Sequence, residues 1–566
     1  GRMTLPPGET GKLTQDGAVE NPRLWSPEDP YLYRMQTWYR VNGGAEYLVQ
    51  EEKVGIRTIA FHPEEGFYLN GVNRKIKGVC VHHDGGCLGA AMRPEVWQRR
   101  LESLKECGCN AIRCSHNPHM PELYALCDAM GFLMMDEAFD EWENPKNKWS
   151  VGHNVYPPRH QGYFEDFPQW HERDLRTMVR RDRNHPSVIL WSIGNEIDYP
   201  NDPYCHAMFQ TMTGNNDANK PEAERKYDAD KPNMERLSVI AAHLAEIVRQ
   251  EDESRPVTLA AAFPELSSQI GFFDALDVVG YNYVGRWRER AETFYEQDRE
   301  AYPDRCMIGT ENPSAGGIRG DYSPEGGFRN YRTATMHHEA LWRYTASHDF
   351  VAGDYLWTGI DYLGETRWPR RGSYSGALDT AGFRKDTFYY FRSIWNTKDI
   401  TLHLLPHWNF EGDEGDYKQV ICYTNCEEVR LYINGRYVGS RGYRCPRYGA
   451  TRVWNEGFDA HSTTNDLHLM WDVAYEPGTL RAEGYVNEKL VAVEEIQTTG
   501  AAAVLEAAGP GRAQVDHPVQ IELCVRDEQG RLVPDACPMI SCSLEGPARL
   551  VGMDGGDLSD LSLYAA

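Results

Sequence analysis

Short apolar runs alternate with amphipathic segments between about residues 66 and 400. A short apolar run is typical of a strand buried on both faces, and apolar residues at helical spacing are typical of a helix that covers a sheet. This alternation predicts βα units and a parallel sheet. Eight such units over about 330 residues predict a (β/α)8 TIM barrel. The expected strands are Lys75–Val81, Asn110–Cys114, Phe132–Asp136, Val188–Ile193, Pro256–Ala261, Ala275–Tyr281, Cys306–Thr310 and Val351–Leu356, and the expected helices include Pro94–Glu106, Pro121–Ala129, Glu172–Arg180 and Met234–Arg249.

The segments on both sides of the barrel have the period of two that is typical of half-buried strands. Such runs include Tyr31–Tyr39, Gln419–Tyr423, Glu428–Ile433 and Val519–Val525, and Asn434-Gly435 predicts a hairpin turn. We therefore expect a multidomain chain in which β-sandwich domains flank the barrel. The expected parts are a partial immunoglobulin-like β-sandwich (1–62), the catalytic barrel (63–405), a β-sandwich (406–498) and a partial immunoglobulin-like β domain (499–566).

Composition and charge argue against some classes of binding partner. The chain has 566 residues and a formal net charge of −25, which argues against binding to nucleic acid or to an anionic membrane surface. It contains no apolar run of the roughly eighteen residues that a membrane span needs. The 14 cysteines are scattered and several lie in apolar runs, which favours a reducing compartment. We expect a bacterial cytoplasmic location rather than a periplasmic one, with export left open.

Two of the predicted barrel strands end in a carboxylate. Val188–Ile193 is followed by Gly194, Asn195 and Glu196, and Cys306–Thr310 is followed by Glu311. The carboxyl ends of barrel strands carry the chemistry of this fold, and two carboxylates in one barrel suggest glycoside hydrolysis. The proton donor needs a raised pKa and the nucleophile must stay ionised, so we expect different surroundings for the two. A lone barrel-end glutamate paired with an arginine is the plainer alternative for either residue.

Further polar and aromatic residues lie at the predicted strand ends. Asn195 is a candidate donor to the sugar 2-hydroxyl, and Arg113 is a candidate to keep Glu311 charged. His82 and His116 are candidates for hydrogen bonds to sugar hydroxyls, although both with a carboxylate would also suit a metal. The last candidates are Tyr283, as a donor to Glu311, and Trp357, as an apolar floor for a pyranose, with core packing as the alternative for both.

An acidic cluster follows the third predicted strand, with Asp136-Glu137 and then Asp140-Glu141. We interpret it as a solvated or salt-bridged rim in preference to a Mg²⁺ site. The polar segment at about 198–232 follows the fourth strand, and we expect a long loop there to shape the site, with disorder as the alternative.

The order of these motifs resembles glycoside hydrolase family 2. The signposts are Asn21-Pro22-Arg23-Leu24-Trp25-Ser26-Pro27, Val54-Gly55-Ile56-Arg57, Asn110-Ala111-Ile112-Arg113-Cys114-Ser115-His116-Asn117-Pro118, Asp136-Glu137-Ala138-Phe139-Asp140, Trp191-Ser192-Ile193-Gly194-Asn195-Glu196 and Gly309-Thr310-Glu311. The resemblance implies a retaining β-glycosidase with Glu196 as acid/base and Glu311 as nucleophile. It also implies that His82, His116, Asn195, Arg113, Tyr283 and Trp357 surround the sugar.

Within this family the sequence looks most like bacterial β-galactosidases that carry extra C-terminal β domains. We therefore expect hydrolysis of terminal β-D-galactosides. Family β-glucuronidases are the rival, and they carry an Asn-x-Lys pair for the sugar carboxylate. The matching place here reads Ser373-Tyr374-Ser375, with Arg370 and Arg371 nearby, which weakens the glucuronide alternative without removing it.

Two departures from the family pattern qualify the expectation. Glu143 stands where some family β-galactosidases have a histidine that binds Mg²⁺, so we expect no metal and no other cofactor. The family's N-terminal jelly-roll, which lends residues to the sugar site, has no counterpart in this sequence. A carbohydrate-binding fragment without turnover thus stays open as an alternative. The expected partner is a carbohydrate substrate, and self-association through the C-terminal β domains stays open.

Overall fold

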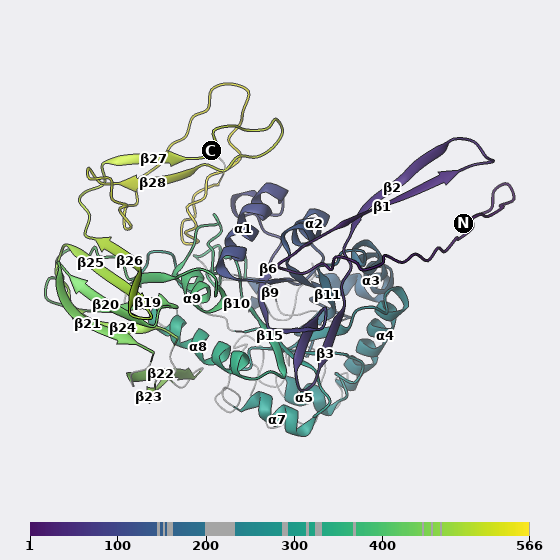
Figure 1. Cartoon of the computed structure of the whole chain (residues 1–566), viewed down its shortest axis with the longest axis horizontal. Coiled ribbons are helices and arrows are strands. Elements are labelled where there is room, and N and C mark those ends of the chain that lie inside the picture. Colours follow the sequence, from purple (N-terminus) through teal and green to yellow (C-terminus); the bar gives the residue numbers. More distant parts are fainter. Residues whose placement is uncertain are drawn as a thin grey trace.

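The computed structural model describes residues 1–143, 148–150, 153–155, 162–198, 233–285, 293–312, 316–322, 331–365, 369–443, 447–453, 457–463 and 467–564. Its centre is a closed barrel of parallel strands in the order β11-β12-β13-β14-β15-β6-β7-β8 (Figure 1). These are β6 (Ile76–Val81), β7 (Ala111–Cys114), β8 (Leu133–Glu137), β11 (Val188–Asn195), β12 (Val257–Ala261), β13 (Val279–Asn282), β14 (Met307–Glu311) and β15 (Val351–Leu356). Each overlaps one of the eight runs expected from the sequence, so the predicted fold class is confirmed.

Helices surround this barrel: α1 (Pro94–Cys107), α2 (Pro121–Met130), α3 (Phe167–Asp182), α4 (Glu235–Glu251), α5 (Pro264–Gln269), α7 (Phe294–Ala301), α8 (Tyr331–Ser347) and α9 (Asp386–Trp395). Pro94 and Pro121 begin α1 and α2, where the missing N–H costs no hydrogen bond. Gly108 and Gly131 end the same two helices in the left-handed conformation that glycine adopts most easily. None of the helices in the described residues is long and apolar enough to cross a lipid bilayer.

A small antiparallel sheet closes the amino-terminal end of the barrel. It consists of β3 (Ile59–His62), β4 (Gly66–Leu69) and β5 (Val72–Arg74). Phe67 and Leu69 on β4 are fully buried and share a core with Ile76 and Tyr355 of the barrel. This sheet was not predicted from the sequence, because its strands of three or four residues follow one another without the helical segments that mark the barrel strands.

The N-terminal strands β1 (Tyr33–Arg40) and β2 (Glu46–Val54) form a hairpin that projects away from the barrel (Figure 1). Its outer side chains include Trp38, Tyr39 and Tyr47, each about half exposed (52%, 50% and 53%).

The C-terminal third is built of antiparallel sheets, one of order β18-β19-β24 and one of order β21-β20-β25-β26, with a shared apolar core around Trp408 and Trp471. The expected turn at Asn434-Gly435 joins two of these strands, β20 and β21. The domain boundaries expected from the sequence stay predictions. The remaining strands are β9 (Lys148–Ser150), β10 (His153–Val155), β16 (Tyr362–Leu363), β17 (Gly372–Ser373), β18 (Leu402–Leu405), β19 (Tyr417–Thr424), β20 (Glu428–Ile433), β21 (Arg436–Gly442), β22 (Arg447–Val453), β23 (Gly457–Thr463), β24 (Leu469–Ala474), β25 (Thr479–Val486), β26 (Lys489–Gln497), β27 (Val504–Ala508) and β28 (Glu522–Arg526).

Candidate active site

The two glutamates singled out in the sequence lie at the carboxyl ends of β11 and β14. Glu196 directly follows β11, and its N–H donates to the carbonyl of Ala260 on β12 at 2.7 Å. Its φ of +45° is unusual for a residue with a side chain, and such backbone conformations cluster at functional sites. Glu311 is the last residue of β14, and its carbonyl accepts from the N–H of Tyr283 at 2.8 Å. The segment expected to form a long loop after β11 lies mostly at residues 199–232, outside the described residues.

Arg113, on β7, connects the buried polar groups of the barrel mouth. Its guanidinium is fully buried and makes a bidentate pair with Glu137, at 2.8 and 2.9 Å. Its Nη1 donates to Oε1 of Glu311 at 2.8 Å, and its Nη2 donates to Oδ1 of Asn195 at 2.9 Å. One planar cation thus fixes the orientation of two carboxylates and one amide.

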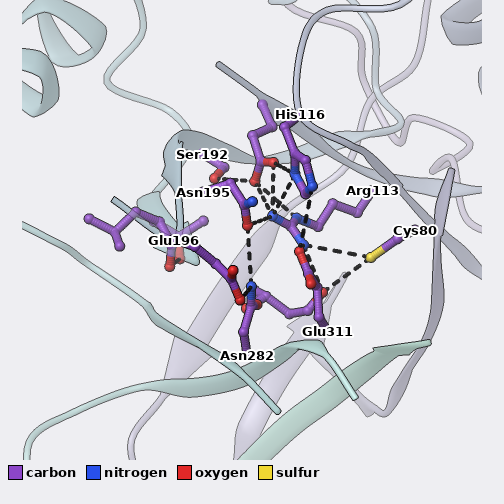
Figure 2. Close-up of polar contacts among 12 residues, drawn as sticks. Cys80, Arg113, His116, Ser192, Asn195, Glu196, Asn282 and Glu311 are labelled. Carbon is purple, nitrogen blue, oxygen red and sulfur yellow. Dashed lines mark hydrogen bonds and ion pairs between the residues drawn. The ribbon is translucent and has the colours of Figure 1, made fainter. Parts of the chain in front are cut away.

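A short series of hydrogen bonds joins the two glutamates (Figure 2). Oδ1 of Asn195 accepts from Arg113 and also from Nδ2 of Asn282, the latter at 3.2 Å. The same Asn282 amide lies 3.2 Å from Oε1 of Glu196. Glu311, Arg113, Asn195, Asn282 and Glu196 therefore belong to one continuous polar network, which brings the carboxylates of β11 and β14 into one site.

Burial is the largest influence on the Glu311 carboxyl, which is only 2% exposed. Burial raises its pKa and the charge of Glu196 raises it further, whereas Arg113, His116 and a hydrogen bond from Tyr283 lower it; the net direction is upward. The sequence analysis expected a raised pKa at the proton donor and an ionised nucleophile. The surroundings of the two carboxyl groups do differ, since Glu311 is buried and Glu196 is half-buried, and burial raises the pKa of the expected nucleophile, Glu311.

His116 lies between Glu137 and Glu311. Its Nδ1 is 2.7 Å from Oε1 of Glu137, and its Nε2 is 3.8 Å from Oε1 of Glu311. Burial opposes protonation of His116, but the hydrogen bond and charge of Glu137, together with the charge of Asp140, outweigh it and raise the pKa. Burial likewise acts to raise the pKa of Glu137, but Arg113 and His116 overcome it, and that pKa is lowered. Glu137 is therefore an anion within the site.

His82 and Trp357 line the same mouth. The Trp357 ring is 5% exposed and stacks on His116, with centroids 5.2 Å apart and planes 4° apart. Burial, helped by the neighbouring His116, lowers the pKa of His82 to about 3, so its imidazole is neutral. Nε2 of His82 is buried and has no hydrogen-bond partner among the described residues, as expected of a group that awaits a ligand hydroxyl.

The structure thus gathers all eight residues predicted from the sequence around one barrel mouth, and it adds three that the sequence analysis did not assign. Glu137 was interpreted as part of a solvated or salt-bridged rim; it is salt-bridged to Arg113, but it is fully buried inside the site and does not lie at a solvated rim. Asn282 ends β13 and bonds Glu196, and its strand-end position was a usable signal. Glu365 accepts from the Tyr362 hydroxyl at 2.5 Å. Burial raises the pKa of Glu365, and so do Glu311 and Asp140.

Glu143, which stands where some family members have a Mg²⁺-binding histidine, is already paired with an arginine. Both carboxylate oxygens of Glu143 contact Arg236, at 3.1 and 3.0 Å. The described residues also contain no group of three or more His, Cys, Asp or Glu side chains placed to share a metal ion.

At the position where family β-glucuronidases carry the Asn-x-Lys pair, this chain has two serines, and the arginines nearby contact other residues. The hydroxyl groups of Ser373 and Ser375 lie 2.9 Å apart. Arg370 stacks over the Tyr374 ring at 5.3 Å, and Arg371 donates to the carbonyl of Ser562 at 2.7 Å. Both arginines therefore already have partners in this structure.

Comparison with known families agrees with this geometry. Residues 62–366 match the family described as "Glycosyl hydrolases family 2, TIM barrel domain", and residues 4–57 match the one described as "Glycosyl hydrolases family 2". Residues 415–492 match a "Domain of unknown function (DUF4982)".

Individual relatives carry two different activity names. The chain is 35% identical to the β-galactosidase BoGH2A of Bacteroides ovatus, over 97% of this chain and 63% of that protein. It is 24% identical to a β-glucuronidase of Bacteroides fragilis, over 77% of this chain and 57% of that protein. A solved β-glycosidase from Bacteroides vulgatus has a TM-score of 0.74 and 30% identity, over 97% of this chain and 66% of that chain. The chain spans less than two thirds of the length of each of these relatives.

Proposed function

Because the chain belongs to glycoside hydrolase family 2, we propose that it is a retaining exo-β-glycosidase, and more narrowly a β-galactosidase that releases terminal β-D-galactose. The observation that supports the proposal most is the hydrogen-bonded series from Glu196 through Asn282, Asn195 and Arg113 to Glu311. Retaining glycosidases need two carboxyl groups at one anomeric centre, one as acid/base and one as nucleophile.

In the first step, the Glu311 carboxylate attacks the anomeric carbon and forms a glycosyl ester. The glycosidic bond breaks, and Glu196 transfers its proton to the departing oxygen. Arg113 holds the attacking carboxylate in place through the 2.8 Å contact with Oε1. The positive charge that develops on the sugar ring is stabilised by the anionic groups of the mouth, including Glu137.

In the second step, Glu196, now a carboxylate, takes a proton from water. The resulting hydroxide attacks the anomeric carbon and the ester bond to Glu311 breaks. Glu311 returns as a carboxylate and Glu196 as an acid. Two inversions at one carbon leave the product with the configuration of the substrate.

The charged groups near the site support a neutral galactoside over a glucuronide as substrate. A uronate carboxylate needs a free cation, yet Arg371 is bonded to Ser562, and Lys385 pairs with Asp361 at 2.8 Å. The name of the Bacteroides ovatus relative points the same way. The name of the Bacteroides fragilis relative supports β-glucuronidase as the second candidate. A panel of aryl β-glycosides decides between them: faster turnover of the glucuronide than of the galactoside would overturn the galactosidase proposal.

Replacing Glu311 tests the nucleophile. We expect Glu311→Gln to lower kcat/KM on an aryl β-galactoside by at least roughly a thousandfold, about 4 kcal/mol of barrier, because an amide cannot form the glycosyl ester. Glu122→Gln, on the exposed face of α2, is the matched control and should keep the parental rate. A loss of less than roughly tenfold in Glu311→Gln would remove Glu311 from this role.

Azide tests the acid/base assignment. In Glu196→Ala, azide should restore turnover of an activated substrate, because the anion can replace water without a general base. The expected product is a glycosyl azide of retained configuration. An inverted azide would contradict the double displacement. Sugar binding without hydrolysis by the parent chain would instead favour the carbohydrate-binding alternative.

A further inference from the structure

A loop near the C-terminal end of the chain packs against the barrel mouth. We call residues 553–564 the C-terminal loop. The N–H of Met553 donates to the carbonyl of Tyr564 at 2.9 Å and closes this loop on itself. Along it, Gly556 and Leu558 are buried while their neighbours at 555, 557 and 559 are exposed. The alternation shows that one side of the loop is packed against other residues.

Leu558 is the apolar anchor of the C-terminal loop. Its side chain is fully buried, and its methyl groups lie so close to Gly372 of β17 that a Cβ there would meet them at 3.0 Å. Gly556 lies closer still to the barrel, since a Cβ on it would come within 2.2 Å of the Asp379 carboxylate. A side chain at Gly556 would therefore collide with the barrel, whereas a Cβ at Gly372 would first meet the Tyr362 carbonyl of its own hairpin, at 2.2 Å.

Two arginines of the barrel hold the same loop by its backbone. The N–H of Arg371 donates to the carbonyl of Leu558 at 3.0 Å, and its guanidinium lies 4.4 Å from the centre of the Tyr564 ring. Arg319 donates to the carbonyl of Gly555 at 2.9 Å and pairs with Asp379 at 2.7 Å. The loop is therefore fixed by directed polar contacts on both sides of Leu558.

The β-hairpin that this loop holds leads directly to the candidate active site. Gly372 and Ser373 of β17 pair with Leu363 and Tyr362 of β16. The Tyr362 ring packs on His82, with centroids 4.2 Å apart, and on Trp357, with centroids 5.7 Å apart.

The strand-one loop is tied to the same hairpin. The N–H of Leu363 donates to the Asp84 carboxylate at 2.6 Å, and Asp84 lies two residues after His82. Tyr362 also holds Glu365 through its hydroxyl. The hairpin therefore fixes the positions of His82, Trp357 and Glu365 at the mouth.

We propose that the C-terminal loop positions the sugar-binding side chains at the ends of β6 and β15 by holding the β16–β17 hairpin, with Leu558 and Arg371 as positioning residues. The effect on sugar binding rests on the function proposed above. The loop itself does not reach the reacting atoms. Its loss should weaken substrate binding more than it slows the chemical step, because Glu311 and Glu196 accept hydrogen bonds from Arg113 of β7 and Asn282 of β13, and the hairpin reaches this network through the stack of Trp357 on His116.

Hydrogen–deuterium exchange tests the structural part without any need for turnover. We expect Leu558→Ala to speed exchange in peptides that cover 359–378, since the cavity loosens the hairpin, and to leave peptides from β11 unchanged. Leu563→Ala is the matched control, because Leu563 lies in the same loop but is 88% exposed. Unchanged exchange in the hairpin of a folded Leu558→Ala protein would overturn the proposal.

Kinetics test the consequence for the site. On an aryl β-galactoside we expect Leu558→Ala to raise KM about tenfold while kcat falls less than about threefold, a pattern that marks lost substrate binding. Leu558→Met should restore the parental KM, and Leu563→Ala should keep it. Loosened exchange with a parental KM would overturn the link to the sugar site. A parent chain that hydrolyses no glycoside would refute the proposed function, and the exchange result would still decide whether the loop holds the hairpin.

Discussion

Glu311 shows how single residues set the conditions of the chemistry. Its carboxyl is buried beside the charge of Glu196, and both influences raise its pKa. The Arg113 guanidinium and the Tyr283 hydrogen bond act against them. The carboxylate must be ionised to attack, so activity should fall as the pH drops through the pKa of Glu311. That pKa lies above the ordinary value for glutamate, so the acid limb of the pH profile should also lie above it.

The Tyr283→Phe variant tests this balance at the same scale. Removing the hydroxyl removes one influence that lowers the pKa of Glu311, so the acid limb of kcat/KM should move to higher pH. A full pH profile on an aryl β-galactoside measures the shift. Tyr390→Phe, in α9, is the control, because the buried Tyr390 hydroxyl has no hydrogen-bond partner among the described residues. An acid limb that stays in place, or moves to lower pH, would contradict this account.

The site residues that could be predicted from the sequence are polar or aromatic residues at or just after the end of a predicted strand. Glu196 and Glu311 follow apolar runs, and so does Glu137, which we instead interpreted as part of a solvated or salt-bridged rim. Its burial depends on Arg113, which is 24 residues away and on the next strand. The contact of Arg113 with Glu311 was anticipated, but its second partner, Glu137, was not, because that pairing depends on the register of β7 and β8 in the closed barrel.

At the level of secondary-structure elements, α1 and α2 both end at a glycine with little space around it. Gly131 ends α2 with a φ of +75°, and a Cβ there would lie 2.5 Å from the carbonyl oxygen of Pro27. Gly71, in the turn between β4 and β5, has a similar φ of +74°, but a Cβ on it would meet no atom within 4 Å. The two positions share the strain of the left-handed backbone and differ only in the steric contact.

Alanine at these two glycines separates the two effects. We expect Gly71→Ala to cost about 1–2 kcal/mol of unfolding free energy from backbone strain alone. Gly131→Ala should cost about 1–3 kcal/mol more, since α2 or the Pro27 backbone must move. Urea unfolding followed by circular dichroism measures both. Equal losses at the two positions would show that the contact with Pro27 has no energetic weight.

The hydrophobic pattern along the chain predicted the barrel strands better than it predicted the small β3-β4-β5 sheet or contacts between residues far apart in the sequence. All eight barrel strands were identified because each is buried on both faces and bounded by helical segments. The sheet β3-β4-β5 was missed because its short strands are not bounded by helical segments. The packing of Leu558 on Gly372 could not be anticipated either, because the contact joins residues 186 positions apart.

For the whole molecule, the net charge of −25 creates a field that acts on charged substrates before they reach the site. A neutral aryl β-galactoside feels little of this field, whereas an aryl β-glucuronide is repelled. Salt shortens the range of the repulsion, to about 10 Å at 0.1 M.

We therefore expect the two substrates to respond differently to ionic strength. Between about 0.02 and 0.3 M KCl, the apparent dissociation constant of the glucuronide, measured as substrate or competitor, should fall several-fold. The KM for the galactoside should change little. A glucuronide that binds less tightly as salt is added would indicate a cationic subsite for the uronate and would favour the second candidate function.

The projecting β1–β2 hairpin is a site at which molecules of the purified protein are expected to associate. In the described part of the chain its two strands pair only with each other, and Trp38, Tyr39 and Tyr47 face the solvent. Unpaired strand edges beside exposed aromatic rings invite neighbouring molecules to add strands. Concentrated stocks should be checked by light scattering before crystallisation. If they aggregate, Trp38→Lys is a sensible first substitution.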